Sequence, residues 1–148
     1  MKRLLPPHLF VLLLISMSLI GYWSGSPHNL AFPVNLIGFA PLLIGLTLAV
    51  TGKNLFRRRR TNIMTFNDPD VLVTDGVFRF SRNPMYLGFA ISMFGAALLT
   101  GAALSSFVIT AVFVVVVDRW YIKFEEQRLE AMFADDFKHY KAKVRRWI

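Results

Sequence analysis

The chain has 148 residues, of which 55% are hydrophobic, and a formal net charge of +8. Its mean hydropathy of +0.48 is too high for an ordinary soluble domain of this length. The absence of cysteine excludes disulfides, thiolate metal sites and cysteine nucleophiles. The three histidines are scattered over different segments, so we expect no metal site.

Two long stretches, residues 4–52 and 83–117, contain no Lys, Arg, Asp or Glu. A transmembrane helix needs about 20 apolar residues, so each stretch has room for two. A turn-like linker at residues 21–29 divides the first stretch, and Thr100-Gly101 divides the second. We therefore predict an all-α integral membrane protein, a single domain over residues 1–148, with spans at about 9–23, 30–51, 84–99 and 103–121 and cytoplasmic segments at 52–83 and 122–148.

A signal peptide is the alternative interpretation of the first span. We favour a span, because the apolar run is too long for a signal peptide and no small-residue cleavage site follows it.

All 17 basic residues fall on one side of this predicted topology. The positive-inside rule assigns that side, and with it both termini, to the cytoplasm. Four consecutive arginines at positions 57–60 would also suit a nucleic-acid contact. We favour anionic lipid headgroups as their partners and predict no nucleic-acid partner.

The segment between the second and third spans has features that a plain connecting loop does not need. Val71, Leu72 and Val73 form an apolar run that a solvated linker would not favour. The following Thr74-Asp75-Gly76 suits a tight turn, with Gly76 at positive φ. Long loops with this many apolar residues are more often functional than disordered.

Asn83 and Pro84 predict a helix start, with Asn83 as N-cap and Pro84 at the first helical position. The positive end of the helix dipole would then lie at the cytoplasmic boundary, where an anionic group is favoured.

Past the fourth span, apolar residues recur at spacings of three or four and predict one amphipathic helix at the membrane surface: Leu129, Met132, Phe133, Phe137, Tyr140, Val144 and Trp147. Glu125 and Glu126 lie at its start. A solvated acidic pair is one interpretation. Because the surrounding face is strongly basic, pairing with a cationic ligand group or with Arg82 is the other.

These segments together resemble the isoprenylcysteine carboxyl methyltransferase and phospholipid methyltransferase superfamily of membrane enzymes. The matching stretches are LVTDGVFRFSRNPMYLG at 72–88, a hydrophobic hairpin, EEQRLEAMF at 125–133 and YKAKVRRWI at 140–148. The resemblance covers about the C-terminal half of the chain. It is to the short prokaryotic type, so we expect the inner (cytoplasmic) membrane of a prokaryote.

The resemblance implies methyl transfer from S-adenosylmethionine, at the cytoplasmic membrane face, to a lipidic or amphipathic acceptor. It assigns cofactor contacts to the loop and helix start, namely Asp70, Val71, Leu72, Val73, Phe78, Asn83, Pro84, Met85 and Tyr86. Glu125 would contact the amino-acid end of the cofactor. Arg82, Glu125 and Glu126 are the candidate catalytic residues.

Two departures from the family pattern concern the substrate. Many members have histidine at the position of Asn83, and eukaryotic prenylcysteine enzymes have arginine at the position of Tyr121. The resemblance therefore implies a reaction type without a particular acceptor.

Two other hypotheses remain open. The scaffold could be a non-catalytic lipid-binding or interaction module, although such a module would have little need for the 82–86 segment and Glu125. A reductase of the same superfamily would need a dinucleotide site, and the sequence has no Gly-rich fingerprint for one.

Overall fold

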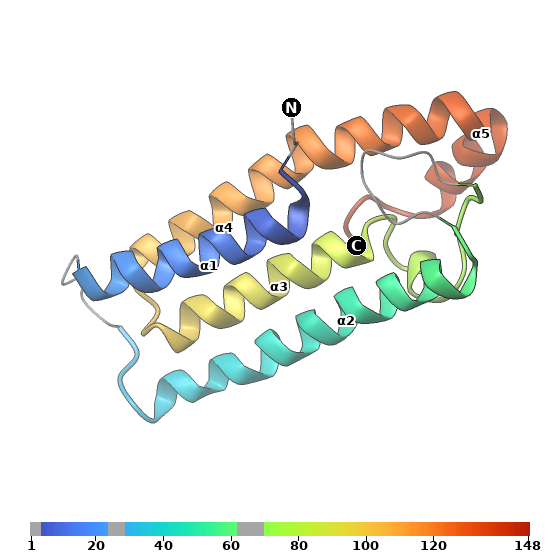
Figure 1. The fold of residues 1–148 in the computed structure, drawn as a ribbon. Helices are drawn as coiled ribbons and strands as arrows, with labels where there is room; N and C mark the ends of the chain where they lie inside the picture. Colours follow the sequence, from blue (N-terminus) through green and yellow to red (C-terminus); the bar gives the residue numbers. More distant parts are fainter. Residues whose placement is uncertain (1–3, 24–28, 62–69) are drawn as a thin grey trace.

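The computed structural model describes residues 4–23, 29–61 and 70–148, in which the regular elements are all helical. Figure 1 shows the longer helices side by side in one elongated bundle. In chain order the elements are α1 (Pro6–Trp23), the 3-10 turn η1 (Val34–Gly38), α2 (Phe39–Arg58), the 3-10 turn η2 (Gly76–Arg79), α3 (Pro84–Leu99), α4 (Leu104–Val116), the π-helix η3 (Val117–Ile122) and α5 (Lys123–Lys143).

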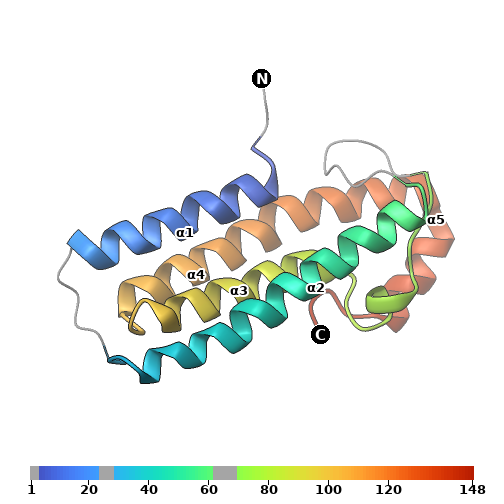
Figure 2. The ribbon, with the colours of Figure 1, turned by 60° about the horizontal axis from the view of Figure 1, so that its bottom comes forward.

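Helix α3 is central, because it packs against α1, α2 and α4, while α1 also packs against α4 (Figures 1 and 2). The core between α1, α3 and α4 is closed by Met17, Met93, Phe113 and Val117, all at most 1% exposed. One end of the bundle holds the short α3–α4 turn. The other end holds the start of α3, most of α5 and the C-terminal residues (Figure 1).

The predicted spans match the helices to different degrees. Helix α3 has the predicted bounds, and α1 begins earlier, because Pro6 and Pro7 fit a first helical turn. The second predicted span, 30–51, is shifted relative to the observed helix: residues 34–38 form η1, and α2 continues to Arg58. Basic residues in its last turn favour this extension, because they face the negative end of the helix dipole.

The predicted end of the fourth span, at residue 121, lies within a continuous helix. Helix α4 continues without a break through η3 into α5 and extends past the end of the bundle (Figure 1). The physical reason is that residues 104–133 contain no glycine or proline to stop the helix.

The single amphipathic helix predicted over 129–147 is also wrong. The backbone bends at Ala134 (φ 39°, ψ −110°), and α5 ends at Lys143. After the bend, Phe137 and Tyr140 are buried against Val73 and Phe78 of the loop between α2 and α3. This part of the apolar face therefore packs on the protein itself.

Helices α2 and α3 touch at small residues. An ideal Cβ on Gly45 would lie 2.6 Å from the amide nitrogen of Ser92, and one on Gly88 would lie 2.7 Å from that of Ala49. Ser92 Oγ also donates a hydrogen bond across the interface to Leu42 O, at 3.1 Å. Small residues and a side-chain hydrogen bond are typical of helix contacts in membranes, where burial of apolar surface gives little driving force.

In the part of the chain that the structure describes, two helical stretches, Pro6–Trp23 and Val34–Arg58, are long and apolar enough to cross a membrane. In an apolar 18-residue window of each stretch, only 22% and 17% of the residues are buried, whereas the core helix of a soluble protein is mostly buried. Large side chains such as Ile15, Leu19, Leu43 and Ile44 are more than half exposed. An apolar surface this continuous marks contact with lipid or with another protein.

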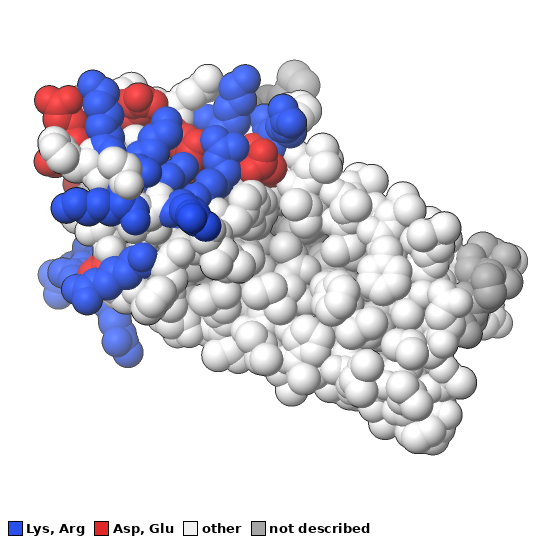
Figure 3. Space-filling view, turned by 180° about the vertical axis from the view of Figure 1, so that it is seen from behind, with Lys and Arg blue, Asp and Glu red and all other residues white. Residues whose placement is uncertain are grey.

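The charged side chains gather at one end of the molecule. In Figure 3 the Lys, Arg, Asp and Glu side chains cover the end that carries α5, and the rest of the visible face has none. Such an asymmetry is what the positive-inside rule leads one to expect of a membrane protein.

We expect Gly45→Leu to destabilise the protein by about 1–3 kcal/mol, because the new side chain must push α2 away from α3. The matched control is Gly21→Ala, since an added Cβ there meets nothing within 4 Å and alanine favours a helix. Thermal unfolding in detergent measures both. Equal melting temperatures for the two variants would contradict the close α2–α3 contact.

Candidate functional site

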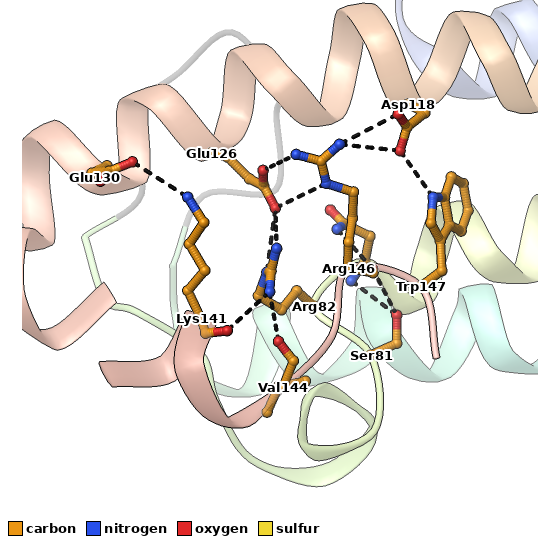
Figure 4. A network of polar contacts seen from close by, with 10 residues as sticks. Ser81, Arg82, Asp118, Glu126, Glu130, Lys141, Val144, Arg146 and Trp147 are labelled. Atoms are coloured by element: carbon orange, nitrogen blue, oxygen red, sulfur yellow. Dashed lines mark hydrogen bonds and ion pairs between the residues drawn. The ribbon is translucent and has the colours of Figure 1, made fainter. Parts of the chain in front are cut away.

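At the charged end of the bundle, Glu126 is held between two arginines (Figure 4). Arg82 donates to Glu126 Oε1 from Nη2 at 2.7 Å and from Nε at 3.2 Å. Arg146 donates to both carboxylate oxygens, from Nη2 to Oε2 and from Nε to Oε1. The side chains of Arg82 and Glu126 are each only 9% exposed, so water screens this pair weakly.

Arg146 also reaches a second carboxylate. Its Nη1 lies 3.3 Å from both oxygens of Asp118, and the indole N–H of Trp147 donates to Asp118 Oδ1 at 2.9 Å. Arg146 thus bridges η3 and α5.

The end of α5 and the residues after it contact the segment before α3 through their carbonyl groups. Arg82 Nη1 donates to the carbonyl oxygens of Val144 and Lys141. The carbonyl of Arg146 accepts from Ser81 Oγ at 3.3 Å and from Asn83 Nδ2 at 3.0 Å. The segment before α3 and the segment after α5 are therefore tied together.

Asn83 precedes α3 and Pro84 begins it, as predicted, but the predicted cap interaction is wrong. The side chain of Asn83 makes no hydrogen bond to the first turn of the helix. It points instead to Arg146, whose carbonyl oxygen needs a donor.

Burial by itself would raise the pKa of the Glu126 carboxyl. The hydrogen bonds and positive charges of Arg146 and Arg82 outweigh burial and hold that pKa below its ordinary value of 4.5. Glu126 therefore carries its charge at neutral pH and neutralises part of the positive charge of Arg82 and Arg146.

The neighbouring carboxylate is part of a second interaction. Tyr86 in the first turn of α3 donates from its hydroxyl to Glu125 Oε1 at 2.7 Å. Tyr86 is 5% exposed, and Glu125 is partly buried. The structure thus brings together Arg82, Asn83 and Tyr86 from one segment with Glu125 and Glu126 from another.

Met85 follows Pro84 in the first turn of α3, and the remaining predicted cofactor residues lie in the loop before this helix. Thr61 Oγ1 accepts from the backbone amides of Asp70 at 3.0 Å and Val71 at 3.2 Å, and so fixes this segment next to the end of α2. Asp70 and Val71 are exposed. Gly76 begins η2 with φ at 57°, which confirms the predicted positive φ.

Val73 and Phe78 are buried in a different cluster from Tyr86. The ring centres of Phe78 and Phe56 are 5.2 Å apart. The backbone carbonyl of Phe78 accepts a hydrogen bond from the Tyr140 hydroxyl at 2.7 Å. The side chains of Val73 and Phe78 are at most 6% exposed, so protein atoms surround these two predicted cofactor contacts.

Leu72 instead borders an open hollow of about 590 Å³ between the loop and the second part of α5. Its other lining residues are Thr74, Arg79, Asp136, His139, Tyr140, Lys143 and Val144. Among the described residues, no group of three His, Asp or Glu side chains could hold a metal ion.

Residues 34–136 match the family model of phospholipid methyltransferases. The chain belongs to the phospholipid methyltransferase family. The match includes Arg82, Tyr86, Glu125 and Glu126 and ends before Arg146.

Two relatives of the chain are named methyltransferases. It is 36% identical over 81 residues to the protein-S-isoprenylcysteine O-methyltransferase of Schizosaccharomyces pombe, covering 53% of this chain and 33% of that protein. It is 27% identical over 127 residues to methanethiol S-methyltransferase 1 of Bradyrhizobium diazoefficiens, covering 82% of this chain and 43% of that protein. The chain thus spans less than half the length of these two relatives. No solved structure matches it.

Three residues of this site were not among those predicted from the sequence: Arg146, Asp118 and Trp147. One signal was present, because Asp118 is the first charged residue after a long apolar run, and such a residue needs a cationic partner. The hydroxyl of Tyr121 donates a hydrogen bond to Leu4 O at 2.8 Å.

We expect the stability of the protein to fall in acid. Because the pKa of Glu126 is lower in the folded state, its contribution is complete above about pH 4.5, the ordinary value, and is lost as the pH falls through the folded-state pKa. Glu126→Gln should destabilise the protein at pH 7 by about 2 kcal/mol, since Arg82 loses its counter-ion, whereas Arg146 keeps Asp118 and is partly exposed.

Thermal unfolding of both proteins between pH 3 and 7 checks this expectation. The matched control is Glu130→Gln, whose surface pair with Lys141 spans 3.7 Å. If Glu126→Gln lost as much stability in acid as the unmodified protein, the cluster would not be the acid-sensitive element.

Proposed function

We propose that this protein transfers a methyl group from S-adenosylmethionine to a lipidic or amphipathic acceptor at the cytoplasmic face of the membrane. One observation carries the proposal: Tyr86 and Glu125, 39 residues apart, are joined by a 2.7 Å hydrogen bond at the charged end of an apolar bundle. Membership of the phospholipid methyltransferase family supports the reaction type.

The chemistry of these residues fits the cofactor. The carboxylate of Glu125 suits its ammonium group, and the hydrogen bond from Tyr86 orients that carboxylate. The first turn of α3 offers the positive end of a helix dipole to the cofactor's carboxylate, and the Asn83 side chain is turned away from it. Exposed Val71 and partly buried Leu72 offer apolar surface for the adenosine.

When bound, S-adenosylmethionine supplies a methyl group that its positively charged sulfur already activates. The protein therefore has to hold the donor and the acceptor in line, and proximity is its main contribution to the rate. Arg82 and Glu126 satisfy each other's charges, so we assign them to shaping the site. Glu125 and Tyr86 are assigned to contacting the cofactor.

The proposal places four helices across the membrane: α1, α2, α3 and the α4–η3 helix. Both termini and the cluster of Lys and Arg side chains would then face the cytoplasm and its anionic headgroups. The exposed apolar side chains of the bundle would contact lipid, and the acceptor would enter between helices from the bilayer. A prokaryotic inner membrane fits this arrangement.

We expect Glu125→Gln to weaken binding of S-adenosylmethionine by about tenfold or more, because a hydrogen bond to a charged group contributes roughly 1.5–3 kcal/mol. Calorimetric titration of the cofactor into the purified full chain in detergent measures this. Glu130→Gln, on the same helix and at the surface, should bind as the unmodified chain does. Equal affinity of the Glu125→Gln variant and the unmodified chain would contradict the assigned role.

The acceptor class is tested with methyl-labelled S-adenosylmethionine and membranes that contain the protein. We expect label in the lipid extract from membranes with the unmodified protein and a loss of that label with the Glu125→Gln variant. Labelled dimethyl sulfide formed from added methanethiol, with no labelled lipid, would replace the lipidic acceptor by a small thiol, as the name of one relative indicates for that protein. No cofactor binding by the folded chain would favour a non-catalytic lipid-binding module.

A further inference from the structure

Arg146 connects three parts of the protein that are far apart in sequence. Its guanidinium bonds to Asp118 in η3 and to Glu126 in α5, 28 and 20 residues earlier. Its carbonyl oxygen accepts from Ser81 and Asn83, which precede α3. Figure 4 shows Arg146 between the carboxylates of Asp118 and Glu126.

The position of Arg82 depends on these contacts. Arg82 donates to Glu126 on one side and to the carbonyls of Lys141 and Val144 on the other. Val144 lies two residues before Arg146, so releasing Arg146 also releases one of the acceptors that orient Arg82.

The balance of charges around Glu126 also indicates a role for Arg146. The cluster contains two carboxylates, Asp118 and Glu126, and two guanidinium groups, Arg82 and Arg146. Without Arg146, Glu126 would keep Arg82 and Asp118 would keep only the exposed Arg119 at 3.9 Å, so no side chain would join the two carboxylates and the turn that carries Glu125 would be free to shift.

We infer that Arg146 is a positioning residue for the cofactor site: it holds the Arg82–Tyr86 segment and the Glu125–Glu126 turn at the separation that binding of S-adenosylmethionine requires. This inference rests on the proposed function and deepens it. Arg146 acts through Glu126 and Arg82 and is not itself a cofactor contact. The residue lies beyond the part of the chain that matches the family model, which ends at 136.

A role in folding alone is the competing explanation, and substitution by lysine separates the two. Lysine keeps the positive charge but lacks the planar fork that holds two carboxylates at once. Arg146→Lys should therefore fold with the charge balance intact while the two segments lose their fixed separation. The matched control is Arg145→Lys, because the Arg145 side chain is exposed.

The experiment is titration of S-adenosylmethionine into the full chain in detergent, with Kd and the number of binding sites per folded chain taken from each curve. We expect Arg146→Lys to raise Kd about tenfold with an unchanged number of sites, and Arg146→Gln to raise it further. Arg145→Lys should match the unmodified chain in both quantities.

A purely structural role gives a different pattern. It would lower the number of binding sites, because fewer molecules are folded, while the remaining ones bind with the original Kd. That pattern would overturn the inference and leave the proposed function standing. Absence of binding by the folded, unmodified chain would overturn the proposed function and the inference with it.

Discussion

The arrangement at the charged end of this protein depends on one buried carboxylate. Glu126 is 7% exposed, and such a charge is tolerated only when it is paired and hydrogen-bonded. Arg82 and Arg146 meet that requirement from two distant parts of the chain. Because the next residue is Glu125, fixing Glu126 also fixes the side chain that bonds to Tyr86. One electrostatic requirement therefore brings the candidate cofactor residues together.

The helix bundle supplies the frame on which this cluster is built. Close contact of α2 and α3 at Gly45 and Gly88 holds α3 in the centre, and the start of α3 carries Asn83 and Tyr86. The unbroken helix from α4 to α5 carries Asp118, Glu125 and Glu126 beyond the apolar part of the molecule. The polar residues can thus meet outside the apolar region.

The sequence was sufficient where a local signal determines the structure. Pro84 defined the start of α3, and Gly76 indicated its own positive φ. Pairing of Arg82 with one of the two glutamates was also foreseen as an alternative, and the partner is Glu126. The bend at Ala134 was not foreseen, because alanine is a strong helix former and the apolar periodicity continues across it. The contacts of Arg146 join residues 20 to 65 positions apart, a distance over which no local pattern is informative.

The central claim is that the start of α3 and the first turn of α5 are two halves of one cofactor site. Ultraviolet cross-linking of radiolabelled S-adenosylmethionine to the purified full chain, followed by tryptic digestion, tests it most directly. We expect label in peptide 83–119, which contains Tyr86, and in peptide 124–128, which contains Glu125, with both lost in excess unlabelled cofactor. Competed label confined to residues 4–52 would contradict the claim.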